Sequence, residues 1–426
     1  MPWKETCSVD QRIACVAEWL EYETPITELA LRYGVSRKTV YKWLDRFEEE
    51  GAPGLADRSR APKRHGRAMA PEIREALLAA RLAHPRWGPR KLRAALARRE
   101  PGIEWPAASS IGELFRRAGL STPRRKTHTV VPLTQPLLHA REANDVWTTD
   151  FKGWFRTRNQ ARCDPLTIND AASRFALCCR IVTPTSAEVR PCFERTFEEY
   201  GLPHAIRSDN GPPFASTGPG RLTRLSVWWL KLGIVLDRID PGHPEQNGRQ
   251  ERFHLTLQQE AGEPPAWTLE EQQARYDRVR WEYNFERPHE ALDNRCPGDV
   301  YVASPRPYPR RLEDPWYDAT HQVRRVHQHG QIKWGGEQVF ISEALTGELV
   351  GIAEADNGDW IVRFTHYELG TIDRNTSRFR AAWHGRRPRH GRRSHPVVAS
   401  EEWRGARRGQ GSPLRSDPAS AGPDGP

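Results

Sequence analysis

Three short segments between residues 146 and 251, each with one candidate catalytic acid, constrain this chain more than any other feature. The first is the apolar-flanked run Val146–Phe151, which is typical of a strand and carries Asp150 near its end. Asp209 follows a short apolar run within Ser-Asp-Asn-Gly, and Glu251 closes Pro-Glu-Gln-Asn-Gly-Arg-Gln-Glu, which leads into a predicted helix. Each carboxylate therefore lies on a regular element or at the end of one.

Carboxylates in three such settings are typical of a site for two divalent metal ions. Mg²⁺ is a hard cation that takes oxygen ligands and keeps several waters. Two ions about 4 Å apart can activate an attacking water or hydroxyl on one side of a phosphorus atom and stabilise the leaving oxygen on the other. Asp150, Asp209 and Glu251 are the candidate catalytic residues and metal ligands, with one carboxylate bridging both ions.

These three segments resemble the DDE core of integrase-type transposases of bacterial insertion sequences and, more distantly, retroviral integrases. A further match is Tyr283–Leu292 (YNFERPHEAL), which resembles the segment that closes the core in these transposases. The resemblance covers most of the chain. It implies a DDE-type polynucleotidyl transferase that binds the ends of an insertion sequence, cuts a strand there and transfers that end to target DNA. The implied cofactors are two Mg²⁺ ions, for which Mn²⁺ can substitute.

Two glutamates compete for the third ligand position. The family typically has 35 residues between its second and third acids, and this gap separates Asp209 from Glu245. Between Asp209 and Glu251 there are 41 residues, yet Glu251 fits the local family pattern Pro-x-x-x-Gly-x-x-Glu. The local pattern favours Glu251.

Helix geometry supports the same choice. Pro244 suits the first position of a helix, which leaves Glu245 in the first turn, where a carboxylate complements the helix dipole. At about 100° per residue, Phe253 and Leu257 lie roughly opposite Glu251. The two apolar side chains can then face the core while Glu251 faces the site.

Residues 1–56 predict three helices arranged as a helix-turn-helix DNA-binding domain. The first spans 9–22, with apolar residues at helical spacing: Ile13, Val16, Ala17 and Leu20. Thr24 is the expected N-cap of the second helix, with Pro25 at its first position. Gly34 breaks the chain, and Ser36 caps the third helix, which extends to residue 49 and is the expected recognition helix.

The recognition helix has an apolar face and a polar face. Val40, Trp43, Leu44 and Phe47 are expected to point inward. The candidate DNA-contacting residues lie off that face: Arg37, Lys38, Thr39, Tyr41 and Lys42. A plain three-helix bundle with a solvated charged face is the alternative, but the short turn and the polar start of the helix favour DNA binding.

A second helical module follows a basic linker. Residues 57–67 form that linker, and residues 68–122 resemble the second helix-turn-helix domain of these transposases, with Ser109 or Ser110 as the cap of its last helix. Arg90 and Lys91 are its candidate DNA-binding residues. Residues 123–143 contain Pro and Thr without periodicity and are predicted to be a second linker.

Residues 144–304 predict an integrase catalytic core with a mixed α/β pattern. After the Asp150 strand we expect strands at 166–169, 177–182, 205–208 and 234–239, and helices at 186–200 and 222–232. The order resembles the ribonuclease H-like fold, which implies that the first and fourth strands are neighbours and that Asp150 lies beside Asp209. We expect Asp170 to be structural in a turn, and residues 212–214 to form a mobile loop near the substrate.

The C-terminal part changes to short β segments. Residues 316–382 are predicted to form a small β-barrel that resembles the SH3-like domains of integrases, with expected strands at 323–326, 331–334, 338–341, 348–353 and 360–364. Asn357-Gly358 is a strong hairpin signal. Residues 383–426 are rich in Arg, Gly, Pro and Ser and are expected to be a disordered basic tail. The predicted fold class is therefore multi-domain, with α-helical modules, an α/β core and a small β-barrel.

Charge and cysteine usage are consistent with this interpretation. The formal net charge of +10 over 426 residues suits double-stranded DNA as partner. The seven cysteines contain no Cys-x-x-Cys pair, which argues against a disulfide framework or a zinc module and fits a reducing cytoplasm. We expect a cytoplasmic, nucleoid-associated protein with no membrane segment, which assembles as a homo-oligomer on DNA because transposition joins two ends. The alternative function is a DNA-binding regulator with an inactive integrase-like core.

Overall fold

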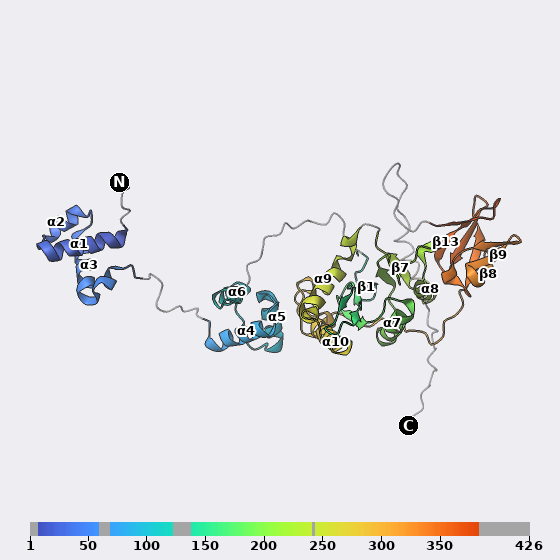
Figure 1. The fold of residues 1–426 in the computed structure, drawn as a ribbon, viewed down its shortest axis with the longest axis horizontal. Coiled ribbons are helices and arrows are strands. Elements are labelled where there is room, and N and C mark those ends of the chain that lie inside the picture. Colours follow the sequence, from blue (N-terminus) through green and yellow to red (C-terminus); the bar gives the residue numbers. More distant parts are fainter. Residues whose placement is uncertain (1–6, 59–68, 122–136, 138, 241–242, 383–426) are drawn as a thin grey trace, which may run out of the picture. The chain divides into compact units, whose positions relative to one another are not determined.

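The computed structural model describes residues 7–58, 69–121, 137, 139–240 and 243–382, apart from the side chains of residues 244 and 245 (Figure 1). These residues separate into two compact units, 1–72 and 73–426. Most of the two predicted linkers and the whole predicted tail lie outside the described residues.

The first unit is the predicted three-helix module. Its helices are α1 (Ser8–Tyr22), α2 (Ile26–Arg32) and α3 (Arg37–Glu50), followed by a 3₁₀ turn, η1 (Ala52–Leu55). Gly34 has a φ of 63°, a left-handed conformation that glycine adopts without strain, and it turns the chain between α2 and α3. The Ser36 hydroxyl accepts a hydrogen bond from the Thr39 N–H at 3.2 Å, so the predicted cap of the third helix is confirmed.

Two predictions for this module are wrong. The N-cap of α2 is Pro25, and the Thr24 hydroxyl donates to the Glu18 carbonyl instead of capping the helix. Ile13 and Leu20 are 47% and 55% exposed, whereas Cys15 and Val16 are buried. On the side of α1 that meets α3, the Arg12 guanidinium lies 3.9 Å from the Trp43 ring centroid.

Three helices of the second predicted module precede the core. They are α4 (Pro71–Ala83), α5 (Pro89–Arg99) and α6 (Ala108–Arg117). Their buried residues include Leu77, Leu92, Ile111 and Phe115, and Trp87 is buried in the connection between α4 and α5. Neither Ser109 nor Ser110 caps α6, because the helix already begins at Ala108, with Ala107 as its N-cap.

The core is built on a five-stranded mixed sheet with the order β5-β4-β1-β6-β7. β1 pairs antiparallel with β4 and parallel with β6, so the predicted first and fourth strands are neighbours. The strands are β1 (Val146–Phe151), β4 (Pro165–Asp170), β5 (Ala176–Ile181), β6 (Ala205–Ser208) and β7 (Val235–Arg238). The sequence did not reveal a short hairpin between β1 and β4, formed by β2 (Phe155–Arg156) and β3 (Arg162–Cys163).

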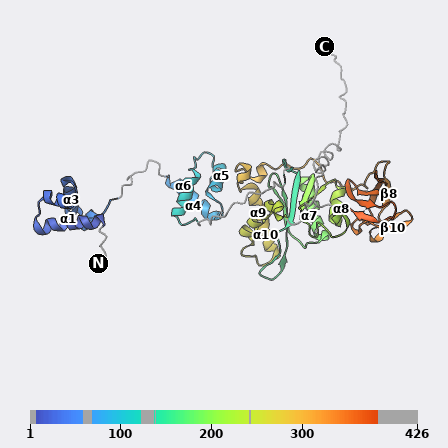
Figure 2. The same ribbon diagram turned by 90° about the horizontal axis from the view of Figure 1, so that it is seen from above.

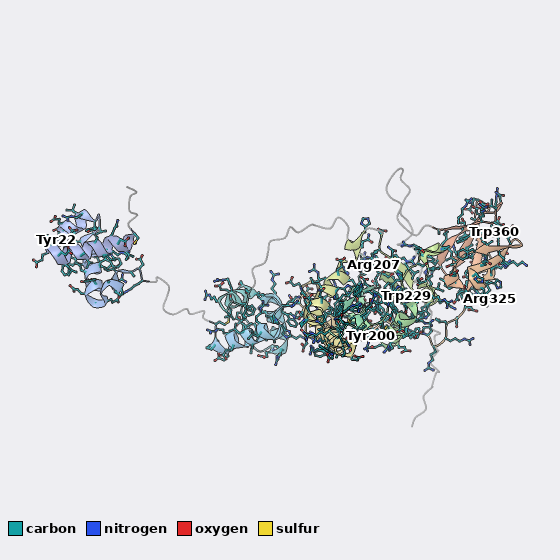
Figure 3. All side chains as sticks on the ribbon, viewed as in Figure 1. Tyr22, Tyr200, Arg207, Trp229, Arg325 and Trp360 are labelled. Atoms are coloured by element: carbon teal, nitrogen blue, oxygen red, sulfur yellow. The ribbon has the colours of Figure 1, made fainter. Side chains whose placement is uncertain are left out.

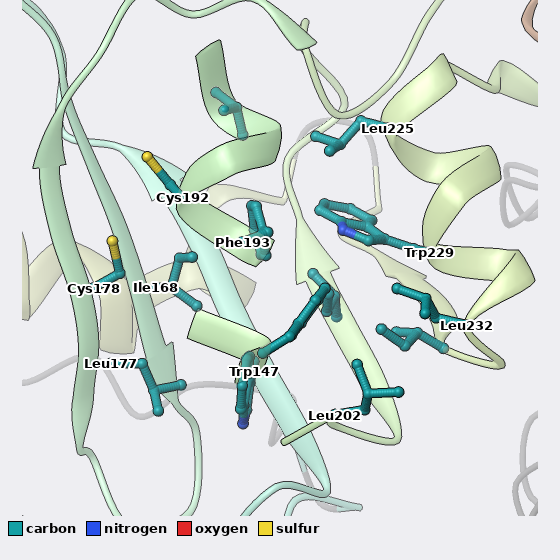
Figure 4. Packing of buried hydrophobic residues seen from close by; sticks show 14 of the residues in the cluster. Trp147, Ile168, Leu177, Cys178, Cys192, Phe193, Leu202, Leu225, Trp229 and Leu232 are labelled. Atoms are coloured by element: carbon teal, nitrogen blue, oxygen red, sulfur yellow. The ribbon is translucent and has the colours of Figure 1, made fainter. Parts of the chain in front are cut away.

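Helices cover both faces of this sheet. α7 (Ser186–Tyr200) and α8 (Arg224–Lys231) lie on one side of β1, and α9 (Gly248–Leu257) and α10 (Leu269–Phe285) lie on the other (Figures 1 and 2). Trp147 and Ile168 point from the sheet toward Phe193 of α7 and Trp229 of α8 (Figure 4). The alternate residues of β1 and β4 therefore face α9.

The Arg207 side chain, labelled in Figure 3, ties β6 to β7. It is buried, and its Nη2 lies 2.8 Å from Oδ2 of Asp237, the residue directly opposite in the parallel ladder. A buried arginine is tolerated when it is paired in this way. The pair fixes the register of the two strands that flank the loop after Ser208.

The C-terminal residues form an antiparallel sheet with the order β14-β13-β12-β11-β8, together with a separate hairpin of β9 and β10. β13 and β14 were not predicted, and the hairpin at Asn357-Gly358 between β11 and β12 is confirmed. The strands are β8 (Gln322–Arg325), β9 (Gln331–Trp334), β10 (Glu337–Phe340), β11 (Leu349–Glu354), β12 (Trp360–Phe364), β13 (Tyr367–Ile372) and β14 (Phe379–Ala381).

Helix α8 joins the catalytic core to this C-terminal sheet. Trp228 and Trp229 belong to the core cluster, whereas Val227 and Leu230 pack with the buried residues of the C-terminal strands. The Lys231 ammonium lies 2.8 Å from the Glu348 carboxylate at the edge of the same contact. An eight-residue helix is thus apolar on two sides, and each side serves a different hydrophobic core.

Leu230→Ala should weaken the C-terminal core directly, and it should also destabilise the larger core because the two are joined through α8. Removing a fully buried leucine side chain costs about 2–5 kcal/mol of unfolding free energy. We expect urea unfolding, followed by circular dichroism and tryptophan fluorescence, to shift to lower urea with both signals moving together. Val302→Ala, at a side chain that is 70% exposed, should change stability by less than about 0.5 kcal/mol. A C-terminal sheet that unfolds alone would contradict the shared core.

Candidate active site

Asp150 lies on β1, on the strand face that is turned toward α9. Its Oδ2 accepts a hydrogen bond of 2.9 Å from Nδ2 of Asn247, and Thr167 lies directly opposite on β4. Burial raises the pKa of Asp150 to about 7, with further contributions from the negative charges of Asp209 and Glu251. The ionised form is therefore costly in the protein alone and would be favoured by a nearby cation.

Asp209 follows β6 directly, and because β6 runs parallel to β1, both strands end at the same edge of the sheet. Its Oδ1 is buried without a hydrogen-bond partner among the described residues. Burial raises the pKa of Asp209, and the N–H of Gly211 offsets this in part. An unpaired buried carboxylate oxygen is costly unless a ligand completes it.

Gly211 is needed for the position of the Asp209 carboxylate. A Cβ on residue 211 would lie 3.0 Å from Oδ2 of Asp209, which is tighter than an ordinary contact. Asn210 anchors the same turn by donating from Nδ2 to the Ile239 carbonyl at 2.8 Å. The Asp-Asn-Gly order thus has a distinct steric or hydrogen-bonding reason at each position.

Glu251 lies in the first turn of α9, with its side chain exposed. Asn247, the hydrogen-bond donor to Asp150, is four residues earlier and therefore on the same side of the helical segment. Phe253 and Leu257 are buried, as predicted. Glu251 thus shares a helix side with a residue that contacts Asp150.

The prediction for Glu245 needs a correction. The segment Pro244–Asn247 is a 3₁₀ helix, and α9 itself begins at Gly248. Pro244 therefore does not begin an α-helix, and the carboxylate in the first turn of α9 is Glu251. The Glu245 side chain lies outside the described residues.

The sequence did not identify the residues that hold α9 against the sheet. Oε1 of the buried Gln250 accepts hydrogen bonds from the Thr148 hydroxyl at 2.7 Å and from Nδ2 of Asn169 at 2.9 Å, and its Nε2 donates to the Thr167 hydroxyl at 2.6 Å. Nε2 of His254 lies 2.7 Å from the same Thr167 hydroxyl. The available signal was polar residues at spacings of three and four along one side of a helix whose other side is apolar.

His254 is neutral in this network. Burial first, and the positive charge of Lys152 second, lower the pKa of His254 to about 4. With the proton on Nε2, His254 and Gln250 both donate to the Thr167 hydroxyl, which itself donates to the Asp150 carbonyl at 3.1 Å. The Thr167 hydroxyl then accepts from two residues of α9 and donates to the Asp150 carbonyl. It therefore links α9 to the backbone of Asp150.

The three candidate carboxylates do not form a complete metal site in this structure. In the described part of the chain, no group of three His, Cys, Asp or Glu side chains is placed to hold a metal ion together. Asp150 and Asp209 are close enough for the charge of Asp209 to raise the pKa of Asp150. The unpaired oxygen of Asp209 and the raised pKa of Asp150 both suit a divalent cation, which would supply the missing positive charge.

Two other sequence expectations concern the surroundings of the site. Asp170 is structural as predicted: its carboxylate accepts hydrogen bonds from the N–H groups of Asn144 and Ser173, both at 2.7 Å. It ends strand β4 and does not lie in the turn itself. The expectation of a mobile loop at residues 212–214 is not supported, because Phe214 is 1% exposed and its ring centroid lies 6.1 Å from that of Trp229.

The predicted DNA-contacting residues of α3 are available at the surface. Arg37, Lys38, Tyr41 and Lys42 are exposed, and Thr39 is half-buried with its hydroxyl 2.9 Å from that of Ser36. Val40 and Leu44, on the opposite face, are buried. α3 therefore has the amphipathic arrangement expected of a recognition helix.

The two candidate residues of α5 differ from each other. Arg90 is exposed, with its guanidinium 4.0 Å from the Glu290 carboxylate. Lys91 is half-buried, and burial, followed by the positive charge of Arg287, lowers the pKa of Lys91 to about 8. Lys91 is therefore less available to a phosphate than Arg90.

Comparison with known proteins identifies the class. Integrase core domain models match residues 140–244 and 232–297, a helix-turn-helix domain model matches 11–63, and a homeodomain-like model matches 39–115. The model of the C-terminal domain of IS481 family transposases matches 321–379. The class is thus a transposase with an integrase core and DNA-binding helix-turn-helix modules.

Two relatives are proteins of insertion elements. The uncharacterized 31.7 kDa protein of insertion element IS407 from Burkholderia multivorans is 31% identical over 237 residues, which cover 54% of this chain and 82% of that protein. The uncharacterized 39.2 kDa protein of insertion element IS476 from Xanthomonas euvesicatoria is 30% identical over 61% of this chain and 74% of its own length. The chain belongs to the same family as these insertion-element proteins, and the predicted DDE-type transposase function is confirmed.

Solved structures of integrases are more distant. The HTLV-2 integrase catalytic core domain in complex with magnesium is 16% identical, with a TM-score of 0.31, over 39% of this chain and 100% of its own. A chain of the simian T-cell lymphotropic virus intasome is 14% identical, with a TM-score of 0.35, over 67% of this chain and 91% of its own. In the described parts of the chain, no helix combines the length and the apolar character that a membrane crossing requires.

The raised pKa of Asp150 predicts a pH-dependent stability effect. Asp150 is protonated in both the folded and unfolded metal-free protein below about pH 4, and its ionisation disfavours the folded state as the pH rises to about 7. Above that pH, Asp150→Asn should raise the free energy of unfolding by on the order of 1–3 kcal/mol, a value discounted for partial solvation. Millimolar Mg²⁺ should stabilise the native protein more than the variant. Thermal unfolding at pH 5 and pH 8, with and without Mg²⁺, measures both effects, and equal stabilisation of both proteins by Mg²⁺ would contradict this role.

Proposed function

We propose that Asp150, Asp209 and Glu251 hold two Mg²⁺ ions and that this site cuts and joins DNA at the ends of the insertion element. The observation that carries the proposal is the parallel pairing of β1 with β6, which ends both strands at one edge of the sheet. Oδ1 of Asp209, at this edge, is buried and has no hydrogen-bond partner in the described part of the chain. One strand at the element's end would be hydrolysed to expose a 3′ hydroxyl. The same site would then direct that hydroxyl at a phosphodiester in target DNA.

The three carboxylates would have different roles. When bound, the two metal ions supply activation of the attacking oxygen and stabilisation of the leaving oxygen, and Mn²⁺ can replace Mg²⁺ in this chemistry. We assign the bridging position to Asp150, because its pKa responds to the charges of both Asp209 and Glu251. Asp209 and Glu251 would each hold one ion. No protein nucleophile is required.

The residues around the carboxylates would orient them. Asn247 donates a hydrogen bond to Oδ2 of Asp150 and so orients this carboxylate. Gln250 and His254 anchor α9 to Thr167, which holds the helix that carries Glu251 against the strand of Asp150. A neutral His254 adds no positive charge that would compete with the metal ions.

DNA recognition would belong to the N-terminal modules. We propose that Arg37, Lys38, Thr39, Tyr41, Lys42 and Arg90 contact the element's end, and we retain Lys91 as a weaker candidate. The protein would work as a homo-oligomer on double-stranded DNA, with the nucleoid in the cytoplasm, because two ends must meet. A strictly monomeric complex that still joins ends would count against this assembly.

We propose the following division of the chain, in which the C-terminal sheet and hairpin belong to an SH3-like β-barrel. The segments are a helix-turn-helix domain (1–56), a basic linker (57–67), a second helix-turn-helix-like domain (68–122), a linker (123–143), the ribonuclease H-like core (144–304), the barrel (316–382) and a disordered basic tail (383–426). Two observations support the barrel. The five strands β14-β13-β12-β11-β8 form one antiparallel sheet, and Val350 and Phe364 belong to a buried core that the sheet shares with the β9–β10 hairpin.

The assignment of the third ligand can be tested with two matched variants. Glu251→Gln keeps the shape of the side chain but removes the charge that holds one hard cation, so strand cleavage should fall by on the order of a hundredfold or more. Glu245→Gln, on the preceding 3₁₀ turn, should retain most activity. The assay is cleavage and joining of a labelled end-duplex with Mg²⁺ or Mn²⁺.

End binding provides the control for this pair, because both variants should bind the duplex like the native protein. Activity that survives in Glu251→Gln but is lost in Glu245→Gln would reverse the assignment. The number of residues from Asp209 would then identify the third ligand better than the local motif does.

The recognition helix predicts two kinds of binding defect. Lys42→Ala should weaken binding to all DNA sequences to a similar degree and reduce its salt dependence, as expected for a phosphate contact. Arg37→Ala should also relax sequence preference, by about 1–3 kcal/mol at one base pair, if its guanidinium contacts a guanine. Competition binding of the full chain at several salt concentrations measures both. A native protein that binds the element's end no better than random DNA would refute the recognition role.

A further inference from the structure

The short hairpin that follows β1 has features of a nucleic-acid contact that the proposed mechanism does not use. Trp154, at the base of this hairpin, is 58% exposed. Residues 152–162 contain four cationic residues and no acidic residue: Lys152, Arg156, Arg158 and Arg162. An exposed aromatic ring among cations complements a polyanion that carries stacking bases.

The position of the hairpin is fixed relative to the sheet. The backbone N–H groups of Arg158 and Asn159 donate to the carbonyls of Ala266 and Trp267 at 2.9 and 3.1 Å, which docks the tip onto the segment before α10. At the base, the Lys152 N–H donates to the Pro165 carbonyl at 3.0 Å. The hairpin is therefore held at both ends.

The orientation of the tryptophan is also fixed. Arg162 makes a bidentate pair with Asp164, at 2.7 and 2.9 Å, and its guanidinium lies 5.2 Å from the Trp154 ring centroid. The Arg156 guanidinium is 6.0 Å from the same centroid, and its Nη1 donates to the Gln160 carbonyl at 2.7 Å. Two anchored cations thus lie by the ring while more than half of its surface stays open to solvent.

Burial does not explain why a tryptophan stands here. The hairpin buries Thr157 and Cys163, and the Trp154 ring remains outside this cluster. Trp154 is the fourth residue after Asp150, so their Cα atoms lie within about 14 Å of each other. Along one DNA strand, with about 3.4 Å of axial rise per nucleotide, that distance covers roughly four nucleotides.

We propose that Trp154 is a stacking platform for an unpaired base of the element's end, a few nucleotides from the phosphate that is cut. Arg162, paired with Asp164, and Arg156 lie by the ring and orient it, and Arg156 would also neutralise a neighbouring phosphate. The inference rests on the proposed function, since it assumes that the element's end enters the site beside Asp150. It adds that the end opens locally, with the open state stabilised by base–aromatic stacking.

The test compares two end-duplexes of the same sequence, one fully paired and one with mismatches in its last pairs, with 2-aminopurine at a mismatched position. Binding of the full-length protein without metal is followed by anisotropy and by quenching of 2-aminopurine. The native protein should prefer the open duplex by about fivefold to 150-fold and quench the probe. Trp154→Ala should lose both effects, and Trp154→Phe should keep part of each. Trp316→Ala, at a tryptophan that is 84% exposed, should behave like the native protein.

Each other outcome has a defined meaning. A native protein without preference for the open duplex, or a Trp154→Ala variant that retains the preference, overturns the proposal. Equal weakening on both duplexes also overturns it, because that result describes a contact with paired DNA. A probe placed in target DNA that is quenched instead of the end probe would refute the assignment to the element's end. Because binding is measured without metal, failure of cleavage by the native protein would count against the proposed function alone.

Discussion

The parallel pairing of β1 with β6 is the interaction on which the rest of the active-site architecture depends. It aligns Val146 with Ala205 and Thr148 with Arg207, so the two strands end together and Asp150 and Asp209 share one edge of the sheet. Parallel pairing requires a long crossover, which α7 provides by packing Phe193 and Phe197 on the face opposite to α9. The burial that stabilises the sheet also desolvates the two carboxylates, which explains why both have raised pKa values.

Two desolvated carboxylates reduce the stability of the fold when no ligand is bound. The polar residues around them limit this loss of stability. Thr148, Thr167 and Asn169 on the strands form hydrogen bonds with Gln250 and His254 on α9, so the polar side of the helix is paired with a polar patch of the sheet. Among the described residues, Oδ1 of Asn169 and Oδ1 of Asp209 are buried without a hydrogen-bond partner. A cation bound by Asp209 would complete the second of these oxygens.

Much of this arrangement could be predicted from local sequence signals. Strand character located β1, β4, β5 and β6, and the predicted helix at 186–200 agrees with the bounds of α7. The sequence did not predict which residues of α1 are buried or where α9 begins. Both places adjoin tertiary contacts that local patterns do not show: Arg12 on Trp43, and Asn247 on Asp150. Gln250 and His254 were missed because polar residues on a helix are usually solvated, and only the opposing strand reveals their burial. The β2–β3 hairpin was missed because two-residue strands have no periodicity to detect.

The central claim is that three carboxylates from β1, the end of β6 and α9 bind two metal ions. The most direct measurement is the anomalous scattering of Mn²⁺ in crystals of the full chain bound to an end-duplex. The account predicts two peaks, one ligated by Asp150 and Asp209 and one by Asp150 and Glu251, about 4 Å apart. A single peak, or a second ion ligated by Glu245 instead of Glu251, would contradict it.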